Sequence, residues 1–365
     1  MSEAFNLPLA QSAIDRDYLQ RDNPELFDLL WSNPLTRVLA MSDGKVLLQE
    51  IDGHAGPQLR LLDIESVPSA QLRVYLGKTT VGQGTEPAGT PVVLAVLGKN
   101  SADGVEPNPE LWHGLRATGA GLTERDAGLF TQALAIANFH ETHKHCAKCG
   151  MPTVIEQGGW SRRCFNDQTQ TFPRTDPAII VSVIDDDGRI LLGSQGSWES
   201  NRWSVLAGFV EAGESLTAAV IREVYEEAGI RVSDVEYLGS QSWPFPYSLM
   251  VAFTARLDSA AGNQELKPDL VEIEKLRWFT REEIAATYAR GELQPEAVAL
   301  ASGLSHSFQL TIDDYVLVNM QGFLELVDVM GGVTLTLDER IPMPGNVPGA
   351  KTDYPPYIGP GEVEM

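Results

Sequence analysis

The stretch that decides the fold is GFVEAGESLTAAVIREVYEEAGI, residues 208–230. Within it, residues 215–228 have the composition of a helix. Ser215 supplies a hydroxyl for the first turn, and Gly229 can end the helix in the left-handed conformation. We therefore expect one amphipathic helix here, entered from a glycine-containing strand.

Acidic residues gather on one face of this expected helix. Glu223, Glu226 and Glu227 fall at i, i+3 and i+4, so their carboxylates crowd together and repel. A hard divalent cation such as Mg²⁺ between them and a pyrophosphate would relieve that repulsion. Arg222 can orient a glutamate, and Gly208 permits close backbone approach. The alternative is an ordinary solvated acidic face.

Composition limits the classes of protein. The chain has 365 residues, 43% of them apolar, which suffices for two or three domains with real cores. It contains no apolar run long enough for a membrane helix and no signal pattern at its start, so we expect a cytoplasmic protein. The net charge of −23 opposes long-range attraction of nucleic acid. Any RNA substrate should be held locally, by one end and through metal.

The first 135 residues or so predict an irregular α+β domain without visible chemistry. Residues 90–97 are strand-like, and residues 98–109 are rich in turn formers. Residues 123–140 then show helical periodicity and predict a helix that links this domain to the next.

The cysteines indicate a metal-binding knuckle. Cys146 and Cys149 form a CxxC pair, and Cys164 follows in a second turn. A second CxxC there would complete a four-thiolate zinc ribbon, but Asp167 stands at the fourth position. Three cysteines do not make a disulfide scaffold.

The fourth ligand leaves two interpretations open. Zinc is bound with Asp167, His145 or His143 completing the tetrahedron, or the ribbon has lost its metal and packs its cysteines as small apolar groups.

Strands are expected on both sides of the acidic helix. Residues 178–184 form a β-branched run typical of a buried strand, and residues 185–188 turn it into a hairpin partner at 189–192. Residues 203–208 lead a further strand into the helix. After the core, residues 278–283 are expected to begin another helix.

Aromatic residues alternate with prolines in YLGSQSWPFPYS, residues 237–248. Prolines at 244 and 246 should hold an extended backbone that displays Trp243, Phe245 and Tyr247. Such aromatic planes suit stacking of a nicotinamide or adenine ring. The alternative is a stiff loop whose aromatics pack a dimer interface.

These motifs resemble a known family. Residues 208–230 fit the signature of the Nudix hydrolases at every fixed position, and residues 241–248 resemble the SQPWPFPxS pattern of the NADH pyrophosphatase branch, with Ser242 in place of its first proline. The resemblance implies a Nudix α/β/α sandwich preceded by a zinc-ribbon-like knuckle and an α+β N-terminal domain. The expected boundaries are 1–140 for the N-terminal domain, 141–173 for the ribbon, 174–292 for the catalytic domain and 300–365 for a separate C-terminal fragment.

The same resemblance implies an activity and its residues. It implies hydrolysis of NAD(H) to the nicotinamide mononucleotide and AMP, removal of NAD caps from RNA 5′ ends, dependence on Mg²⁺ or Mn²⁺, and a homodimer. Glu227 is expected to be the most sensitive catalytic residue, with Glu223, Glu226 and Arg222 beside it. Divalent metals would be held by the Ala207 carbonyl, Glu223, Glu226, Glu227 and Glu272; zinc, if present, by Cys146, Cys149, Cys164 and Asp167.

The resemblance also implies substrate contacts at residues before and after the acidic helix in the sequence. Phe172 stands where the family can have a tyrosine, so stacking would survive without the hydroxyl, and Ala299 would match a contacting alanine. The remaining expected contacts are Gln241, Ser242, Trp243, Pro244, Phe245, Pro246, Tyr247 and Ser248. Two alternatives remain. One is a Nudix enzyme for another nucleoside diphosphate such as ADP-ribose, and the other is a non-catalytic nucleotide-binding module.

The C-terminal part has a different character. Residues 310–339 suggest strand, amphipathic helix, glycine pair and strand, and the stretches DDYVLVNMQGFLELVDVMGGV and TDYPPYIGPGE resemble an internal piece of the LytR-CpsA-Psr proteins. We expect this piece, without the ends of its parent domain, to be no transferase and to dock loosely or be poorly ordered.

Overall fold

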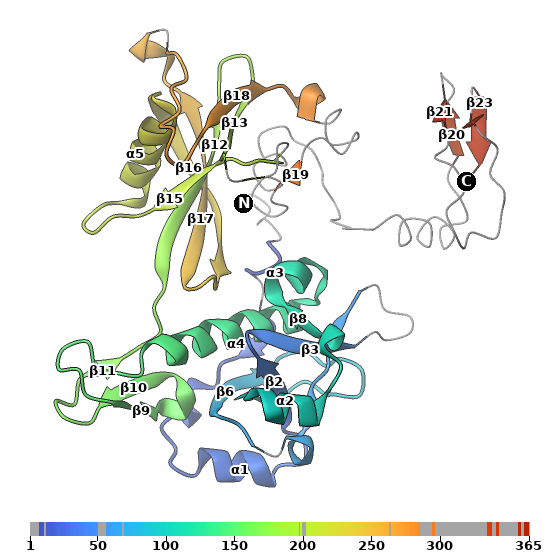
Figure 1. Cartoon of the computed structure of the whole chain (residues 1–365), viewed down its shortest axis with the longest axis vertical. Helices are drawn as coiled ribbons and strands as arrows, with labels where there is room; N and C mark the ends of the chain where they lie inside the picture. Colours follow the sequence, from blue (N-terminus) through green and yellow to red (C-terminus); the bar gives the residue numbers. More distant parts are fainter. Residues whose placement is uncertain are drawn as a thin grey trace. The chain divides into compact units, whose positions relative to one another are not determined.

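The fold was derived from a computed structural model of the chain (Figure 1). It describes residues 7–10, 12–49, 56–67, 69–196, 198, 202–262 and 264–284, together with short strand segments at 294–295, 334–337, 341–342, 357–358 and 361–364. The chain divides into two compact units, residues 1–313 and 314–365. The expected contact at Ala299 and the amphipathic helix expected before the glycine pair at 331–332 lie outside the described residues.

A six-stranded mixed sheet carries the acidic helix. Its order is β16-β17-β12-β13-β18, with β15 paired to β12. The β12–β17 pair is parallel, whereas the other pairs are antiparallel. The elements are β12 Asp176–Ile184, β13 Ile190–Ser194, β14 Arg202–Trp203, β15 Leu206–Phe209, α5 Leu216–Ala228, β16 Val232–Trp243, β17 Ser248–Leu257, η6 Ser259–Ala261, β18 Lys275–Phe279 and β19 Gln294–Pro295, which pairs with β14.

Both faces of this sheet are covered. Ile179, Val181 and Val183 of β12 alternate onto one face, where they pack with alanines and valines of α5. Ile180 points to the other face and packs in a cluster that includes Ile284, in the helical segment 281–284. This alternation follows from the two-residue period of a strand. The expected α/β/α sandwich is confirmed.

The N-terminal domain is built on an eight-stranded sheet of order β1-β6-β7-β2-β3-β4, with β5 on β2 and β8 on β3. Its longest helix, α4, packs on one face through Leu129, Phe130 and Leu134. The elements are β1 Ile14–Asp15, η1 Tyr18–Gln20, α1 Leu26–Ser32, β2 Arg37–Ser42, β3 Lys45–Gln49, β4 Gln58–Leu59, β5 Leu62–Asp63, η2 Ile64–Ser66, β6 Leu72–Thr79, β7 Pro91–Val96, α2 Lys99–Val105, η3 Pro109–Leu111, β8 Trp112–Gly114, α3 Leu115–Thr118, η4 Gly119–Gly121 and α4 Glu124–Thr142.

The two sheets share one topology. The strand order β6-β7-β2-β3-β8 with β5 on β2 repeats the order β16-β17-β12-β13-β18 with β15 on β12, and the one parallel pair, β2–β7, corresponds to β12–β17. The difference lies in the connection that leads into β16 and into its counterpart β6. Where the catalytic sheet has α5, the N-terminal sheet has only residues 64–71, which begin with η2. The N-terminal copy thus keeps the sheet without the acidic helix.

Two local expectations were wrong. Residues 98–109, expected as turns, contain the helix α2, whose residue Ala102 packs against the sheet. The helix expected from residue 278 begins only after Thr280, because Trp278 and Phe279 belong to β18. There Thr280 and Glu283 cap each other, since each side chain accepts the other's backbone N–H.

The knuckle follows α4 directly. The expected linking helix is confirmed as Glu124–Thr142, with Thr123 capping its start. The ribbon consists of β9 Thr153–Glu156, η5 Gln157–Gly159, β10 Ser161–Cys164 and β11 Gln170–Thr171. His140 of α4 bonds to the Gly159 carbonyl at 2.7 Å and accepts from Arg162 at 2.9 Å. These buried contacts fix the ribbon to the helix.

The C-terminal unit is described only in four strands. β20 Thr334–Leu337 pairs with β23 Gly361–Glu364, and β21 Ile341–Pro342 pairs with β22 Tyr357–Ile358. β20 confirms the strand expected after the glycine pair. The expected loose packing of this segment involves residues outside the described ones.

Candidate active site and metal centre

Helix α5 begins and ends as its sequence requires. The Ser215 hydroxyl accepts the Ala218 N–H at 3.2 Å, and Gly229 ends the helix at φ 69°. Before the helix, β15 passes very close to it. A Cβ added to Gly208 would lie 2.1 Å from the Glu223 carboxyl. Glycine is therefore needed at residue 208 to admit the Glu223 side chain.

Glu227 is the buried charge of the site. Only 4% of the residue is exposed, and its Oε2 atom has no hydrogen-bond partner among the described residues. Burial, together with the charges of Glu223, Glu272, Asp269 and Glu226, raises its pKa to about 8. Removing a carboxylate from water and surrounding it with like charges is unfavourable unless a cation is bound.

Glu223 lies beside Glu227 and is also largely enclosed. Burial raises the pKa of Glu223 even though Arg222 opposes the shift. The charges of Glu226 and Glu272 add to that rise. The face predicted from i, i+3 and i+4 spacing therefore exists, with its carboxylates electrostatically coupled.

Arg222 holds the acidic residues from the side. Its guanidinium makes two parallel bonds to Glu214, at 2.9 Å each, and donates to the Phe209 carbonyl. It also contacts Glu223 and Glu226, each at 2.9 Å. The hydrogen bonds of Arg222 to Glu214 and to its other glutamate partners raise the pKa of Arg222, so its guanidinium stays positively charged. Arg222 thus pairs with glutamates as expected, and its main partner is Glu214, which was not among the expected site residues.

The remaining expected ligands differ in placement. The Glu226 side chain is 58% exposed and is engaged by Arg222, so its role as a ligand stays a prediction. Glu272 lies in the loop before β18, and its charge acts on both Glu223 and Glu227. Ala207 lies in β15, opposite Ile180 of β12, one residue before Gly208.

These residues fit a hard divalent cation. Oxygen ligands are what Mg²⁺ and Mn²⁺ take, and the unpartnered Glu227 Oε2 is an acceptor that a cation would satisfy. The like charges of Glu223 and Glu272 around it would be neutralised in the same step. Mg²⁺ and Mn²⁺ are the ions that the resemblance to Nudix hydrolases implies.

The aromatic segment has a different shape from the one expected. It is extended only to Trp243, at the end of β16, and residues 244–247 then turn the chain into β17, with Trp243 opposite Ser248. The prolines serve a hairpin turn rather than a long ribbon. Among the other expected contacts, Gln241 is buried with an unpartnered Oε1, whereas Phe172 is 55% exposed.

The turn is held by the N-terminal domain. Trp243 and Phe245 meet edge to face at 5.0 Å and pack against the core cluster that contains α4. The Asn138 side chain of α4 donates to the carbonyls of Pro244 and Pro246, at 3.0 and 3.1 Å. Asn138 was missed from the sequence, although a polar residue within an apolar helical pattern was the available signal.

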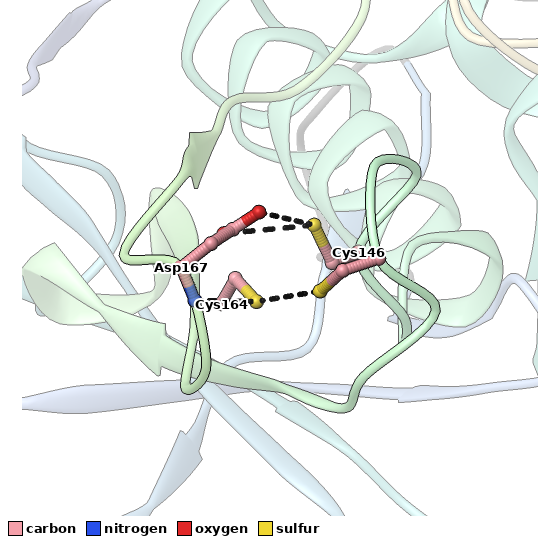
Figure 2. A group of neighbouring side chains, drawn as sticks. Cys146, Cys164 and Asp167 are labelled. Carbon is pink, nitrogen blue, oxygen red and sulfur yellow. Dashed lines mark hydrogen bonds between the residues drawn. The ribbon is translucent and has the colours of Figure 1, made fainter.

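The cysteines form a compact group (Figure 2). Cys146, Cys149, Cys164 and Asp167 place one ligand atom each within 4.8 Å of one another. The Cys149 and Cys164 sulfurs are 3.4 Å apart, and the Cys146 sulfur is 3.9 Å from the Asp167 oxygens. Sulfurs bound tetrahedrally to Zn²⁺ at about 2.3 Å would be separated by about 3.8 Å. The group therefore fits zinc.

The ionisable groups of this cluster differ in their pKa. Although the Asp167 backbone N–H opposes the shift, burial and the side chains of Asp167 and Cys149 raise the pKa of the Cys164 thiol to about 11. The Met151 backbone N–H, and then Cys164, lower the pKa of Cys149. The Thr169 N–H, followed by the Cys164 contact, lowers the pKa of Asp167 to about 2, so this fourth ligand is ionised. His143 and His145 lie outside the group. Zinc, if bound, would be held by the three thiolates and Asp167 and would tie the two turns of the ribbon together.

Asp167→Cys tests the fourth ligand. We expect zinc affinity to rise by about tenfold or more, because a fourth thiolate replaces a weaker oxygen ligand. Competition of the full chain with a zinc-chelating dye measures this, and Asp187→Cys, on an exposed turn, controls for an added thiol. Unchanged zinc affinity in Asp167→Cys would mean that residue 167 is not a ligand.

The mixed sheet with its acidic, glycine-approached helix defines the class of protein. Residues 173–299 match the family model described as NUDIX domain, so this part of the chain is a Nudix domain. Two further matches define the branch. Residues 141–172 match the NADH pyrophosphatase zinc ribbon domain, and residues 35–138 match the NADH pyrophosphatase-like rudimentary NUDIX domain. The three matched segments resemble the domains of the NADH pyrophosphatase branch, as the sequence motifs predicted.

Relatives are similar over part of their length. The chain is 43% identical over 178 residues to the NAD-capped RNA hydrolase NudC of Mycobacterium tuberculosis, a match that covers 49% of this chain and 56% of that protein. It is 38% identical over 194 residues to the human NAD-capped RNA hydrolase NUDT12, covering 51% of this chain and 41% of that protein. The chain thus spans about half the length of these relatives. A crystal structure of a NUDIX hydrolase from Nitrosomonas europaea aligns with 38% of this chain and 79% of its own, at 24% identity and TM-score 0.32.

The C-terminal resemblance is also confirmed. Residues 269–362 match the LytR_cpsA_psr family model, which overlaps the end of the Nudix match. In the part of the chain that the structure describes, no helix combines the length and apolar character needed to cross a membrane.

Proposed function

We propose that this chain hydrolyses the pyrophosphate of NAD(H) to the nicotinamide mononucleotide and AMP, and removes NAD caps from RNA 5′ ends. The observation that carries the proposal is the buried, unpartnered Glu227 beside Glu223 on the Nudix helix. The relatives named for NAD-capped RNA hydrolysis support the substrate class. We further propose that the protein acts in the cytoplasm as a homodimer.

The protein side of the mechanism follows from the geometry. Glu223, Glu227, Glu272 and the Ala207 carbonyl would hold Mg²⁺ or Mn²⁺, which neutralises phosphate charge and lowers the pKa of a bound water. Glu227, enclosed by the helix and the sheet, would orient the attacking water and accept its proton. Arg222 keeps Glu223 pointing toward Gly208 through its 2.9 Å contact. No covalent enzyme nucleophile is needed.

The hairpin turn would recognise the dinucleotide. Gln241, Ser242 and residues 243–248 are proposed to line it, with the aromatic pair Trp243 and Phe245 stiffened by the Asn138 contacts. Phe172 and Ala299 remain proposed contacts. The boundaries 1–140, 141–173, 174–292 and 300–365 are likewise proposed as the functional divisions of the chain.

Substrate profiling of the full chain tests the proposal. NADH, ADP-ribose and an NAD-capped RNA are each incubated with Mg²⁺ or Mn²⁺, and products are separated by chromatography. We expect mononucleotides from NADH and a 5′-monophosphate end on the RNA. Faster cleavage of ADP-ribose than of both NAD substrates would assign the site to another nucleoside diphosphate. Binding of all three without cleavage would indicate a nucleotide-binding module instead.

A further inference from the structure

The loop before β18 is organised by one carboxylate. Asp269 Oδ1 accepts the backbone N–H groups of Val271, Glu272 and Ile273, at 3.1, 3.2 and 2.8 Å, and Oδ2 accepts that of Glu272 at 3.3 Å. Three consecutive amides thus converge on a single side chain. Hydrogen bonds to a charged acceptor are about twice as strong as neutral ones.

Little else holds this loop. Leu270 and Val271 are 73% and 88% exposed, so they add no core packing, and Leu270 has the left-handed φ of 62°. The Leu270 N–H bonds back to the Ile273 carbonyl at 3.0 Å, and Ile273 is anchored in the α5-side core. The conformation of residues 270–272 therefore depends on the Asp269 carboxylate.

The loop lies beside α5, since Ile273 packs in the same core cluster as Val224 and Ala228. The charges of both Asp269 and Glu272 contribute to the raised pKa of Glu227. Asp269 itself behaves differently, because its amide donors outweigh burial and lower its pKa. Its oxygens are occupied by backbone amides, whereas no described residue bonds to the Glu272 carboxylate.

We propose that Asp269 is a positioning residue. By accepting the backbone N–H groups of residues 271–273, it fixes the backbone from which the Glu272 side chain extends toward the proposed metal ligands of α5. The inference rests on the proposed function for the role of Glu272. Both Asp269 oxygens accept backbone N–H groups, so Asp269 itself is not proposed as a metal ligand. Partners that orient a metal ligand typically contribute 10- to 100-fold to metal affinity.

Isothermal titration calorimetry of the full, metal-free chain with Mn²⁺ tests this without substrate. We expect Asp269→Ala to weaken Mn²⁺ binding about tenfold, as Glu272→Gln does. Asp269→Asn should restore affinity to within about threefold of the wild type, because its amide oxygen still accepts the same N–H groups. Asp258→Ala is the matched control, since Asp258 also caps a loop amide, that of Ala260, but in another turn.

The outcomes separate the alternatives. The positioning role would be overturned if either Asp269→Ala or Glu272→Gln bound Mn²⁺ as tightly as the wild type does. Equal losses in Asp269→Ala and Asp269→Asn with folding intact would also overturn it, since charge rather than loop geometry would then matter. If Asp269→Ala does not fold, a tenfold loss in a folded Asp269→Asn decides against it. Absence of NADH cleavage by the wild type would refute the proposed function without changing this binding comparison.

Discussion

Glu227→Gln is expected to lower turnover of NADH by about 10³-fold while leaving the chain folded, a loss at the upper end for one electrostatic group. The substitution keeps the shape of the side chain but removes the negative charge that would bind cations and orient water. Initial rates at saturating Mg²⁺ or Mn²⁺ measure it. Undiminished activity in this variant would refute the role assigned to Glu227.

The same variant should change the pH dependence of stability in the absence of metal. The pKa of Glu227 is raised to about 8 in the fold, whereas an unfolded glutamate titrates near 4.5. The native state therefore binds more protons between these values, and the free energy of unfolding falls as pH rises from about 4.5 to 8. The total is roughly 4 kcal/mol at 1.36 kcal/mol per pKa unit.

Glu227→Gln should abolish most of that fall, so the metal-free variant is expected to be more stable than the wild type at pH 8. Urea denaturation at pH 5 and pH 8 measures the difference. Glu236→Gln, which removes an exposed carboxylate of β16, is the control and should keep the wild-type slope. A wild-type slope in Glu227→Gln would mean that Glu227 does not carry the raised pKa.

Gly208→Ala is expected to reduce kcat by about 10²-fold, the cost of displacing a catalytic group by about 1 Å. The new methyl would lie 2.1 Å from the Glu223 carboxyl, which must move and so lose its 2.9 Å contact with Arg222. Because the displaced atoms end a flexible side chain, stability should change little. Rates and thermal unfolding of the same preparation measure both effects.

Gly239→Ala provides the matched control for this substitution. Gly239 lies in β16 of the same sheet, and an added Cβ there meets only Leu7, at an ordinary 3.6 Å. We expect near wild-type rates for it. A fully active Gly208→Ala would show that Glu223 does not need its observed position.

Patterns with strong local periodicity were predictable from sequence. The residues 215–229 specify their own helix, caps and acidic face, and the β-branched run at 178–184 specifies a buried strand. Whether a carboxylate becomes buried, as Glu227 does and Glu226 does not, depends on which strand packs against each side of the helix. Spacing alone placed all three glutamates on one face and could not rank them.

Features set by distant contacts were not predictable. The turn at 244–247 depends on Asn138, more than a hundred residues earlier, which bonds two of its carbonyls. The loop at 269–273 depends on a short Asp motif that resembles many surface turns. The N-terminal sheet was called irregular because several of its strands contain only two or three residues, too few to show a period of two.

Helix α4 packs on the N-terminal sheet and also holds the hairpin turn at residues 244–247. After β18 the chain enters a helical segment that begins at residue 281. After β8 it passes through α3 and η4 into α4, which carries Asn138 and continues to Thr142, just before the ribbon. The N-terminal sheet, which has no counterpart of α5, can thus contribute to the proposed activity by holding the hairpin turn. Packing changes in the α4 core, which includes none of the acidic residues of α5, should alter the affinity for dinucleotides before they alter the chemical step.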